Sequence, residues 1–365
     1  LGEWVNRSRV LAVAGTHGKT TTTAMATEIL ASAGLDPTGF VGGRVRAWNG
    51  NLRFGGEALF VVEADEYDRS FHALRPEVAV VTNLEADHLD VFGSLEGVRA
   101  AFLDFAMAVP EEGRVAFCGD DPEASGLAVA LGPRAYSYGT SPGSQLRGEA
   151  VSLSRVGSHF RAVEAGRDRG RLELAVPGIH NVRNALGAAA AARALGVEWR
   201  PIREGLAAFE GVARRFHVLG EARGVTVVDD YAHHPTEIRA TLEAARAAFP
   251  ERRKVVVFQP HLFSRTRDFA EEFGRALGGA DEAWITDVYP AREEPIPGVT
   301  GELVADAARE AGAPAVRYHA ELRTLAPALA PTLARGDVCL TMGAGTVEAL
   351  GPELLRELER EGPHG

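Results

Sequence analysis

Apolar runs alternate with amphipathic stretches over the first part of the chain. The apolar runs occupy residues 10–14, 58–64, 78–82 and 114–118. Because their apolar residues are continuous rather than alternating, these runs are typical of parallel strands that are buried on both faces. Helical patterns at residues 20–33 and 94–109 lie between them. This alternation predicts a mostly parallel sheet, whereas residues 39–56, rich in Gly, Asn and Arg, are predicted to form a loop.

The pattern changes between residues 150 and 176. Three segments there alternate apolar and polar residues and are separated by Gly, Arg and Asp. Such alternation predicts a small antiparallel sheet with one face toward water. An Ala-rich helix at residues 180–195 and a shorter helix that ends near residue 209 are predicted to follow it.

The strand-and-helix alternation starts again near residue 211. Predicted strands occupy residues 225–229, 254–258, 283–288 and 337–342. Predicted helices occupy residues 235–249, 265–277, 301–311, 321–333 and 347–361. This order predicts a second α/β domain of the doubly wound, Rossmann-like type. We place the predicted boundary between domains of residues 1–212 and 213–365.

Composition narrows the classes of function. The chain has 365 residues, enough for two or three domains, and a net charge of −11, which argues against nucleic acid as a partner. No apolar run is long enough to cross a bilayer, so membrane insertion is not expected. Cys118 and Cys339 lie in apolar, strand-like runs and are predicted to be buried free thiols in a reducing compartment. We therefore expect a cytoplasmic protein.

The first predicted strand and helix are joined by a turn of small residues that contains a lysine. Glycines let backbone N–H groups reach phosphate oxygens, and the start of the helix adds positive potential. Lys19 would neutralise charge on the β- and γ-phosphates, and the Thr20 hydroxyl would contact magnesium. The alternative is a Gly- and Thr-rich turn without a ligand. The candidate nucleotide-binding residues of this turn are Gly15, Thr16, His17, Gly18, Lys19, Thr20 and Thr21.

Lysine occurs only at Lys19 and Lys254, while every other basic side chain is Arg or His. A compact ammonium group suits a point contact with phosphate better than a planar guanidinium group does. Lys19 is therefore expected to serve that contact, the alternative being that a lysine stands there by chance.

Two acidic clusters follow neighbouring predicted strands. Glu63 begins the sequence EADEYD after strand 58–64, and His88 belongs to EADHLD after strand 78–82. The carboxyl ends of parallel strands meet at the ligand-binding edge of an open α/β sheet. Carboxylates gathered there are costly without a cation, and magnesium bound to ATP phosphates would supply one. The alternatives are a solvated acidic loop and a hydrogen-bonded structural histidine.

Polar residues also begin the Ala-rich helix and follow the strands of the second predicted domain. His180, Asn181 and Asn184 lie near one helical turn, and Asn amides can bind adenine, although Asn is also a common helix cap. In the second domain, polar sequences follow three predicted strands, which favours a ligand-binding cleft over ordinary turns. These sequences are DDYAHHPTE, FQPHLFSRTR and MGAGT.

Together these motifs resemble the Mur ligase family, the ATP-dependent enzymes that add amino acids to the peptidoglycan precursor. They run in family order over nearly the whole chain: GTHGKTTTT, EADEYDRSF, NLEADHLD, PGIHNVRNA, RRFHVLG, DDYAHHPTE, FQPHLFSRTRD, DVYPAREEPIPG and TMGAGT. The resemblance implies a central P-loop-type ATPase domain followed by the Rossmann-like domain. A further upstream domain that holds the UDP-sugar is expected to be absent, because the chain opens at Leu1 just before the first strand.

The resemblance also implies roles for individual residues. Lys19 and Thr20 are expected on the phosphates, and the metal ligands are expected to be Thr20, Glu63 and His88. The residues expected near the rest of ATP are His180, Asn181, Asn184, Arg215 and Asp230. Those expected at the muramate and alanine end are Tyr231, His233, His234, His261 and Arg265. The expected catalytic residues are Lys19, His88, His234, His261 and Arg265.

This chain departs from the family at two points. Many relatives have Arg where this chain has Leu262, so the resemblance does not establish one of the substrate contacts. Several Mur ligases hold a second metal with a carbamylated lysine, but no lysine lies between Lys19 and Lys254 here.

The function that the resemblance implies is ATP-dependent joining of L-alanine to the lactyl carboxylate of UDP-N-acetylmuramate, through an acyl phosphate. Either His234 or His261 is expected to accept the ammonium proton. The alternatives are the family member that recycles muramyl tripeptide, a P-loop ATPase switch, and a non-catalytic nucleotide-binding module. The expected assembly is a monomer or a weak homodimer.

Overall fold

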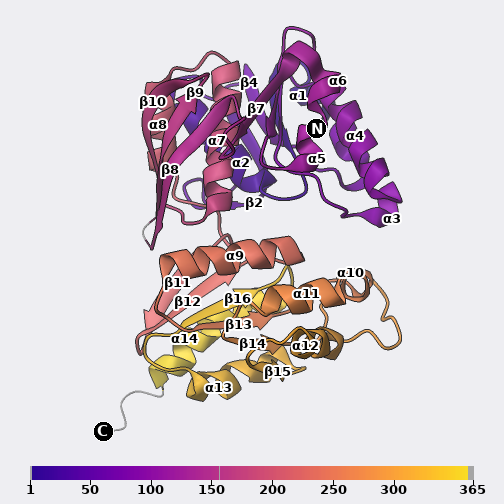
Figure 1. Ribbon diagram of the computed structural model, residues 1–365, viewed down its shortest axis with the longest axis vertical. Coiled ribbons are helices and arrows are strands. Elements are labelled where there is room, and N and C mark those ends of the chain that lie inside the picture. Colours follow the sequence, from indigo (N-terminus) through magenta and orange to yellow (C-terminus); the bar gives the residue numbers. More distant parts are fainter. Residues whose placement is uncertain (1, 156, 361–365) are drawn as a thin grey trace. The chain divides into compact units, whose positions relative to one another are not determined.

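The chain folds into two compact units, Leu1–Ala213 and Arg214–Gly365 (Figure 1). The computed structural model describes residues 2–155 and 157–360, and within these each unit is built on one sheet, of ten and six strands respectively. The predicted fold class, α/β with a large, mostly parallel sheet and a second sheet, is confirmed. Within the described residues, no helix is long and apolar enough to cross a membrane.

The first sheet has the strand order β10-β9-β8-β7-β6-β5-β1-β4-β2-β3. Its strands are β1 (Arg9–Ala14), β2 (Thr38–Val45), β3 (Gly50–Arg53), β4 (Leu59–Glu63), β5 (Val78–Val81), β6 (Arg114–Cys118), β7 (Ala135–Gly139), β8 (Leu146–Ser154), β9 (Gly157–Glu164) and β10 (Arg167–Leu174). The helices of this unit are α1 (Gly2–Val5), α2 (Lys19–Ser32), η1 (Tyr67–Ala73), α3 (Leu89–Phe92), α4 (Leu95–Met107), α5 (Pro122–Ser125), α6 (Ala128–Leu131), η2 (Gly132–Arg134), α7 (Ile179–Ala194) and α8 (Trp199–Ala208).

The predicted loop at residues 39–56 is wrong, because this stretch forms the hairpin of β2 and β3. The two strands are antiparallel, and β2 also pairs in parallel with β4. The indole N–H of Trp48 donates to Glu28 Oε1 on α2 at 2.6 Å, which ties the hairpin tip to the helix. Local composition did not indicate the hairpin, because these tertiary contacts stabilise it rather than strand propensity.

The antiparallel strands β8, β9 and β10 are confirmed, but a separate small sheet is not. β8 pairs in parallel with β7 through Tyr138 and Leu146, so the three strands extend the large sheet. Only two residue pairs make that junction, and they are too few to leave a pattern in the sequence.

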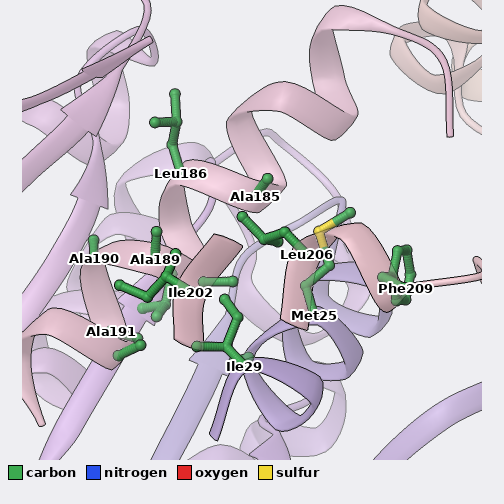
Figure 2. Close-up of a cluster of buried hydrophobic side chains, with 14 of the residues drawn as sticks. Met25, Ile29, Ala185, Leu186, Ala189, Ala190, Ala191, Ile202, Leu206 and Phe209 are labelled. Atoms are coloured by element: carbon green, nitrogen blue, oxygen red, sulfur yellow. The ribbon is translucent and has the colours of Figure 1, made fainter. Parts of the chain in front are cut away.

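The first unit buries apolar residues on both faces of its sheet. Along β1, Leu11 and Val13 face one cluster, whereas Val10, Ala12 and Ala14 face the other. The first cluster includes side chains of α2, α7 and α8, and Figure 2 shows Met25, Ile29, Ile202 and Leu206 meeting the alanines of α7. Small alanine side chains let α7 approach α2 closely, which positions both helices at the sheet. The second cluster includes side chains of α1 and α4.

The second sheet has the strand order β11-β12-β16-β13-β14-β15. Its strands are β11 (His217–Ala222), β12 (Val225–Asp230), β13 (Lys254–Phe258), β14 (Glu282–Ile285), β15 (Val316–Tyr318) and β16 (Val338–Met342). The helices of this unit are α9 (Pro235–Ala248), α10 (Phe263–Asp268), α11 (Ala270–Leu277), α12 (Gly301–Glu310), η3 (Leu322–Thr324), α13 (Leu325–Leu329), η4 (Ala330–Thr332), η5 (Thr346–Ala349) and α14 (Leu350–Arg360).

Helices cover both faces of the second sheet, as the doubly wound prediction requires. One apolar cluster includes side chains of α9, α11 and α12, and the other includes α13 and α14; Figure 1 shows α9 and α13 on opposite faces. The four predicted strands are confirmed, but the edge strands β11 and β15 were not predicted. Each is partly exposed, so neither has a continuous apolar run. The predicted helix at 265–277 is interrupted at Phe269, and the one at 321–333 is three short segments.

Gly205 supports the fold where α8 crosses α2. A Cβ atom at this position would lie 2.5 Å from the Ile29 Cα atom and 2.8 Å from its backbone nitrogen. We expect Gly205→Ala to lower the free energy of unfolding by about 1–3 kcal/mol, because the two helices must separate. Urea denaturation measures this loss. In the matched variant Gly143→Ala the new methyl group enters open space, and unchanged stability is expected. A Gly205→Ala variant as stable as wild type would contradict the close packing of α8 on α2.

Candidate active site

The candidate site of the first unit lies where three neighbouring parallel strands end. β1 lies between β4 and β5 in the sheet, with Val13 beside Glu63 and Ala14 beside Val81. The loops that follow these strands therefore leave the sheet at the same edge, which is where open α/β sheets bind ligands.

The loop after β1 has the backbone shape of a phosphate-binding turn. Gly15 and Gly18 have φ angles of 139° and 81°, which side chains rarely tolerate. A Cβ atom at Gly15 would lie 1.9 Å from Thr82 Oγ1, and one at Gly18 would lie 2.5 Å from Asn184 Oδ1. Neither position accepts a larger residue, and α2 begins immediately afterwards at Lys19. The loop thus leads directly into the positive end of a helix dipole.

Residues that follow β5 hold this loop in place. Asn83 accepts from the backbone N–H of His17 through Oδ1 at 2.8 Å and from that of Thr16 through its carbonyl at 3.0 Å. The Thr82 hydroxyl donates to the carbonyl of His17 at 2.6 Å. The His17 ring lies 3.6 Å from a carboxylate oxygen of Glu85. Sequence reasoning did not single out Thr82 and Asn83, although both stand at the end of a predicted strand.

Lys19 forms an ion pair with a buried carboxylate. Its ammonium group donates to both carboxylate oxygens of Glu66, at 2.7 and 2.9 Å, and to the carbonyl of Gly15 at 2.7 Å. Burial disfavours the charged lysine, but the carboxylates of Glu66, Asp65 and Glu63 together raise the pKa of Lys19. Burial also raises the pKa of Glu66, against the opposing effect of Lys19. The sequence placed Glu66 in an acidic cluster for magnesium but did not identify it as the partner of Lys19.

Thr20 and Glu63 form a cluster of oxygen atoms beside the loop. The Thr20 hydroxyl donates to Glu63 Oε1 at 2.9 Å, and Glu63 Oε2 accepts from the backbone N–H of Gly42 at 2.5 Å. Hydroxyl and carboxylate oxygens are the donors that Mg²⁺ prefers, so these two residues fit the ion. The structure therefore brings together two of the three expected metal ligands.

His88, the third expected metal ligand, has other neighbours. Its ring packs edge-on against Tyr67 at 5.2 Å and lies 3.9 Å from a carboxylate oxygen of Asp87. Among residues 2–155 and 157–360, no hydrogen bond or ion pair joins His88 to Thr20 or Glu63. Its φ angle of 52° places it in the left-handed region. Its role as a metal ligand stays a prediction.

The first turn of α7 adjoins the phosphate loop. Asn181 and Asn184 are nearly buried, and the Asn184 amide donates to Asn181 Oδ1 at 3.3 Å. Asn181 donates in turn to the carbonyl of Pro177 at 2.7 Å. Because Asn184 also lies against Gly18, the predicted base-binding residues are held next to the loop. Their contact with a base, and that of His180, stays a prediction.

In the second unit, Asp230 is buried at the end of β12 and accepts hydrogen bonds from the backbone. Its two carboxylate oxygens accept from the backbone N–H groups of Phe216 and Ala232, at 2.7 and 2.8 Å. Burial raises its pKa to about 6, although Arg215 opposes this. Both oxygens already have protein partners, so the structure gives Asp230 a structural task; its expected contact with ATP stays a prediction.

Two arginines lie close to the ring of Tyr231. The guanidinium groups of Arg214 and Arg215 lie 5.0 and 5.3 Å from the ring centre. Arg214 also pairs with Asp229 at 3.1 Å and with Glu348 at 2.9 Å, while Arg215 pairs with Glu237 at 3.2 Å. Cation–π contacts with both arginines position the Tyr231 ring just after β12. The sequence singled out Arg215 but not Arg214.

The two histidines after Tyr231 have different surroundings. His233 Nδ1 lies 3.0 Å from the carbonyl of Tyr231 and 3.2 Å from Glu237 Oε2. His234 caps α9, since its Nδ1 accepts from the backbone N–H of Thr236 at 3.4 Å, and its ring packs edge-on against Phe269. His234 is thus engaged in holding the start of the helix.

His261 lies at the end of β13, beside a residue that sequence reasoning did not single out. Its ring stacks on Tyr289 at 5.8 Å, and Leu262 donates to the carbonyl of Tyr289 at 3.0 Å. Within the described residues, His261 Nδ1 is buried and has no hydrogen-bond partner. Burial lowers the pKa of His261 to about 4, and His233 and Arg265 add to this effect. His261 is therefore a neutral base at neutral pH.

Lys254, the second lysine, caps the end of α9. Its buried ammonium group donates to the carbonyls of Phe249 at 2.7 Å and Pro250 at 3.3 Å, and to that of Arg252. Cys118 and Cys339, as predicted, are buried free thiols.

Family patterns match both units. The Mur ligase middle domain matches residues 13–192, and the Mur ligase glutamate ligase domain matches residues 214–345. The UDP-N-acetylmuramate–L-alanine ligase of Salinibacter ruber is 46% identical over 362 residues, which are 99% of this chain and 76% of that protein. The chain belongs to the Mur ligase family. The ligase of the same name from Renibacterium salmoninarum is 48% identical, over 96% of this chain and 74% of its own length.

Solved structures agree with this Mur ligase assignment. The UDP-N-acetylmuramate–alanine ligase MurC of Thermotoga maritima superposes with a TM-score of 0.81 at 31% identity, covering 98% of this chain and 76% of that one. A murein peptide ligase from Psychrobacter arcticus superposes with a TM-score of 0.70 at 26% identity, covering 98% and 79%.

The low pKa of His261 in this Mur ligase can be tested directly by a pH titration. Because the midpoint of protonation lies near pH 4, we expect its ring signals in histidine NMR spectra to change little from pH 8 to pH 5.5. The spectrum of His261→Gln assigns those signals. A titration midpoint within this window would contradict the neutral state that burial imposes.

Proposed function

We propose that this Mur ligase joins L-alanine to the lactyl carboxylate of UDP-N-acetylmuramate, with ATP converted to ADP and phosphate, as a step of peptidoglycan synthesis. The observation that carries the proposal is the cluster of Lys19, Thr20 and Glu63 at the phosphate loop. Identities of 44–48% to ligases with this activity in their names support the choice of substrates.

The first step is activation of the carboxylate. A lactyl carboxylate oxygen attacks the γ-phosphorus of ATP, ADP leaves, and an acyl phosphate forms. We propose that backbone N–H groups at the start of α2 and the Lys19 ammonium group stabilise negative charge on the transferring phosphoryl group. Asn181 and Asn184, held beside Gly18, are proposed to bind the base.

Mg²⁺ is the cofactor that fits the loop. Thr20 and Glu63 supply two oxygen donors 2.9 Å apart, and we assign His88 to the same metal cluster on the family resemblance. When bound, the ion would neutralise charge on the phosphates.

The second step is attack by the amine. The nitrogen of L-alanine attacks the acyl carbonyl carbon, and the tetrahedral intermediate collapses to an amide and inorganic phosphate. The ammonium form of alanine must first lose a proton to a base. We assign that role to His261 rather than His234, because His261 Nδ1 lacks a protein partner in the described residues, whereas His234 Nδ1 caps α9. Arg265, which is nearly buried nearby, is proposed to hold a substrate carboxylate.

The proposal includes a cellular setting. The substrates are soluble nucleotide precursors, and both cysteines are free thiols, which supports the cytoplasm as the location. A second candidate is ligation of a muramyl tripeptide, which the similarity to the murein peptide ligase favours.

Phosphate release separates these functions. The protein is supplied with Mg²⁺, ATP, UDP-N-acetylmuramate and one amine at a time. We expect release to require both the sugar nucleotide and L-alanine. Dependence on a tripeptide would replace the proposal with the recycling activity, and release without any amine would indicate an ATPase switch.

Removal of Lys19 tests the phosphate role. We expect Lys19→Ala to lower phosphate release by about 100-fold or more, because charge on the transferred group loses its ammonium partner. The change also leaves Glu66 buried without its cation, which destabilises the fold. The double variant Lys19→Ala/Glu66→Gln should therefore regain thermal stability but not activity. Wild-type turnover in either variant would contradict the phosphate role.

A further inference from the structure

The ammonium group of Lys19 has no hydrogen to spare. Its three closest acceptors are Glu66 Oε2 at 2.7 Å, the carbonyl of Gly15 at 2.7 Å and Glu66 Oε1 at 2.9 Å, and the carbonyl of Thr16 lies farther away at 3.4 Å. The side chain is only 12% exposed. A phosphate oxygen that binds Lys19 must therefore replace one of these partners, and two of the three belong to Glu66.

Glu66 is held in position by the core as well as by Lys19. Its side chain is 4% exposed, and it lies three residues beyond the end of β4. The carbonyl of Asp65 accepts from the backbone N–H of Phe71 at 3.1 Å. Phe71 is fully buried and stacks on Phe105 at 5.0 Å. The segment that carries Glu66 is therefore anchored to the apolar core through Phe71.

The chain just after Glu66 is strained. Asp68 and Arg69 both have φ angles of 54°, in the left-handed region that favours glycine. Two consecutive residues in this conformation cost free energy that a shift of the segment would release. Both residues lie inside η1 but are not helical, so the backbone directly after Glu66 is irregular.

We propose that Glu66 is a positioning residue that competes with the γ-phosphate of ATP for Lys19. It holds the ammonium group inside the loop, and it yields that group when a triphosphate binds. The carboxylate and the phosphate are both negative, so only one of them is favourable beside a single ammonium group. The proposal rests on the nucleotide-binding role proposed above, and it makes Glu66 a determinant of how tightly the γ-phosphate is bound.

The matched variants Glu66→Gln and Asp65→Asn test this competition. Glu66→Gln keeps the side-chain size but removes the charge, whereas Asp65 is 59% exposed and lies 4.0 Å from the Lys19 nitrogen. By calorimetric titration with Mg²⁺ and AMP-PNP, we expect Glu66→Gln to bind about threefold to tenfold more tightly than wild type. The affinity of Glu66→Gln for ADP, which has no γ-phosphate, should rise less. Asp65→Asn should bind AMP-PNP with nearly the wild-type affinity.

Unchanged or weaker AMP-PNP binding by a folded Glu66→Gln variant would overturn the competition. Failure of the wild-type protein to bind AMP-PNP at all would instead overturn the proposed function. The two failures are therefore distinguishable in one series of titrations.

Lysine labelling tests, without any nucleotide, whether Glu66 holds Lys19 in the loop, an ion pair that we call the clamp. The chain has only two lysines, so acetylation by an amine-reactive ester, followed by mass spectrometry, monitors Lys19 separately from Lys254. We expect Lys19 to react about threefold or more faster in Glu66→Gln, because the carboxylate no longer holds the side chain inside the loop. Lys254 serves as the internal standard. Equal acetylation rates of Lys19 in wild type and Glu66→Gln would overturn the clamp. If Glu66→Gln does not fold, Glu66→Asp, whose shorter side chain withdraws the carboxylate, replaces it in both measurements.

Discussion

One ammonium group, that of Lys19, is held among oxygen atoms where three parallel strands end. The sheet order places β1 between β4 and β5, so the phosphate loop, the acidic segment after β4 and Asn83 share one edge. Packing of α2 against α7 and α8 fixes the direction in which the loop enters the helix. The positions of Glu63, Thr20 and Asn184 follow from that arrangement, because each contacts the loop or the first turn of α2.

Much of this edge could be predicted from the sequence. Continuous apolar runs identified β1, β4 and β5, since a strand buried on both faces has no polar alternation. Glycine at positions 15 and 18 and the lysine that follows identified the loop, because both glycines require positive φ angles. The family order of the motifs indicated ligase chemistry, which local patterns alone do not reveal.

The remaining features depend on contacts between distant residues. The β2–β3 hairpin is tied down by Trp48 and Glu28, and the clamp on Lys19 is formed by a carboxylate 47 residues away. Neither pairing leaves a periodic signal. The two lysines illustrate the same point, because each ammonium group donates to oxygen atoms on several sides, in the loop for Lys19 and at the end of α9 for Lys254. A planar guanidinium group does not match that geometry, which accounts for lysine at these positions in an arginine-rich chain.

A crystal structure with Mg²⁺ and AMP-PNP tests most directly whether this edge binds the triphosphate. The arrangement of the loop predicts a γ-phosphate oxygen about 3 Å from the Lys19 nitrogen, and the metal ion bound by Thr20 and Glu63. It also predicts that Glu66 no longer pairs with Lys19 through both oxygens. A triphosphate bound elsewhere, or a Lys19–Glu66 pair unchanged beside it, would contradict the central role given to this ammonium group.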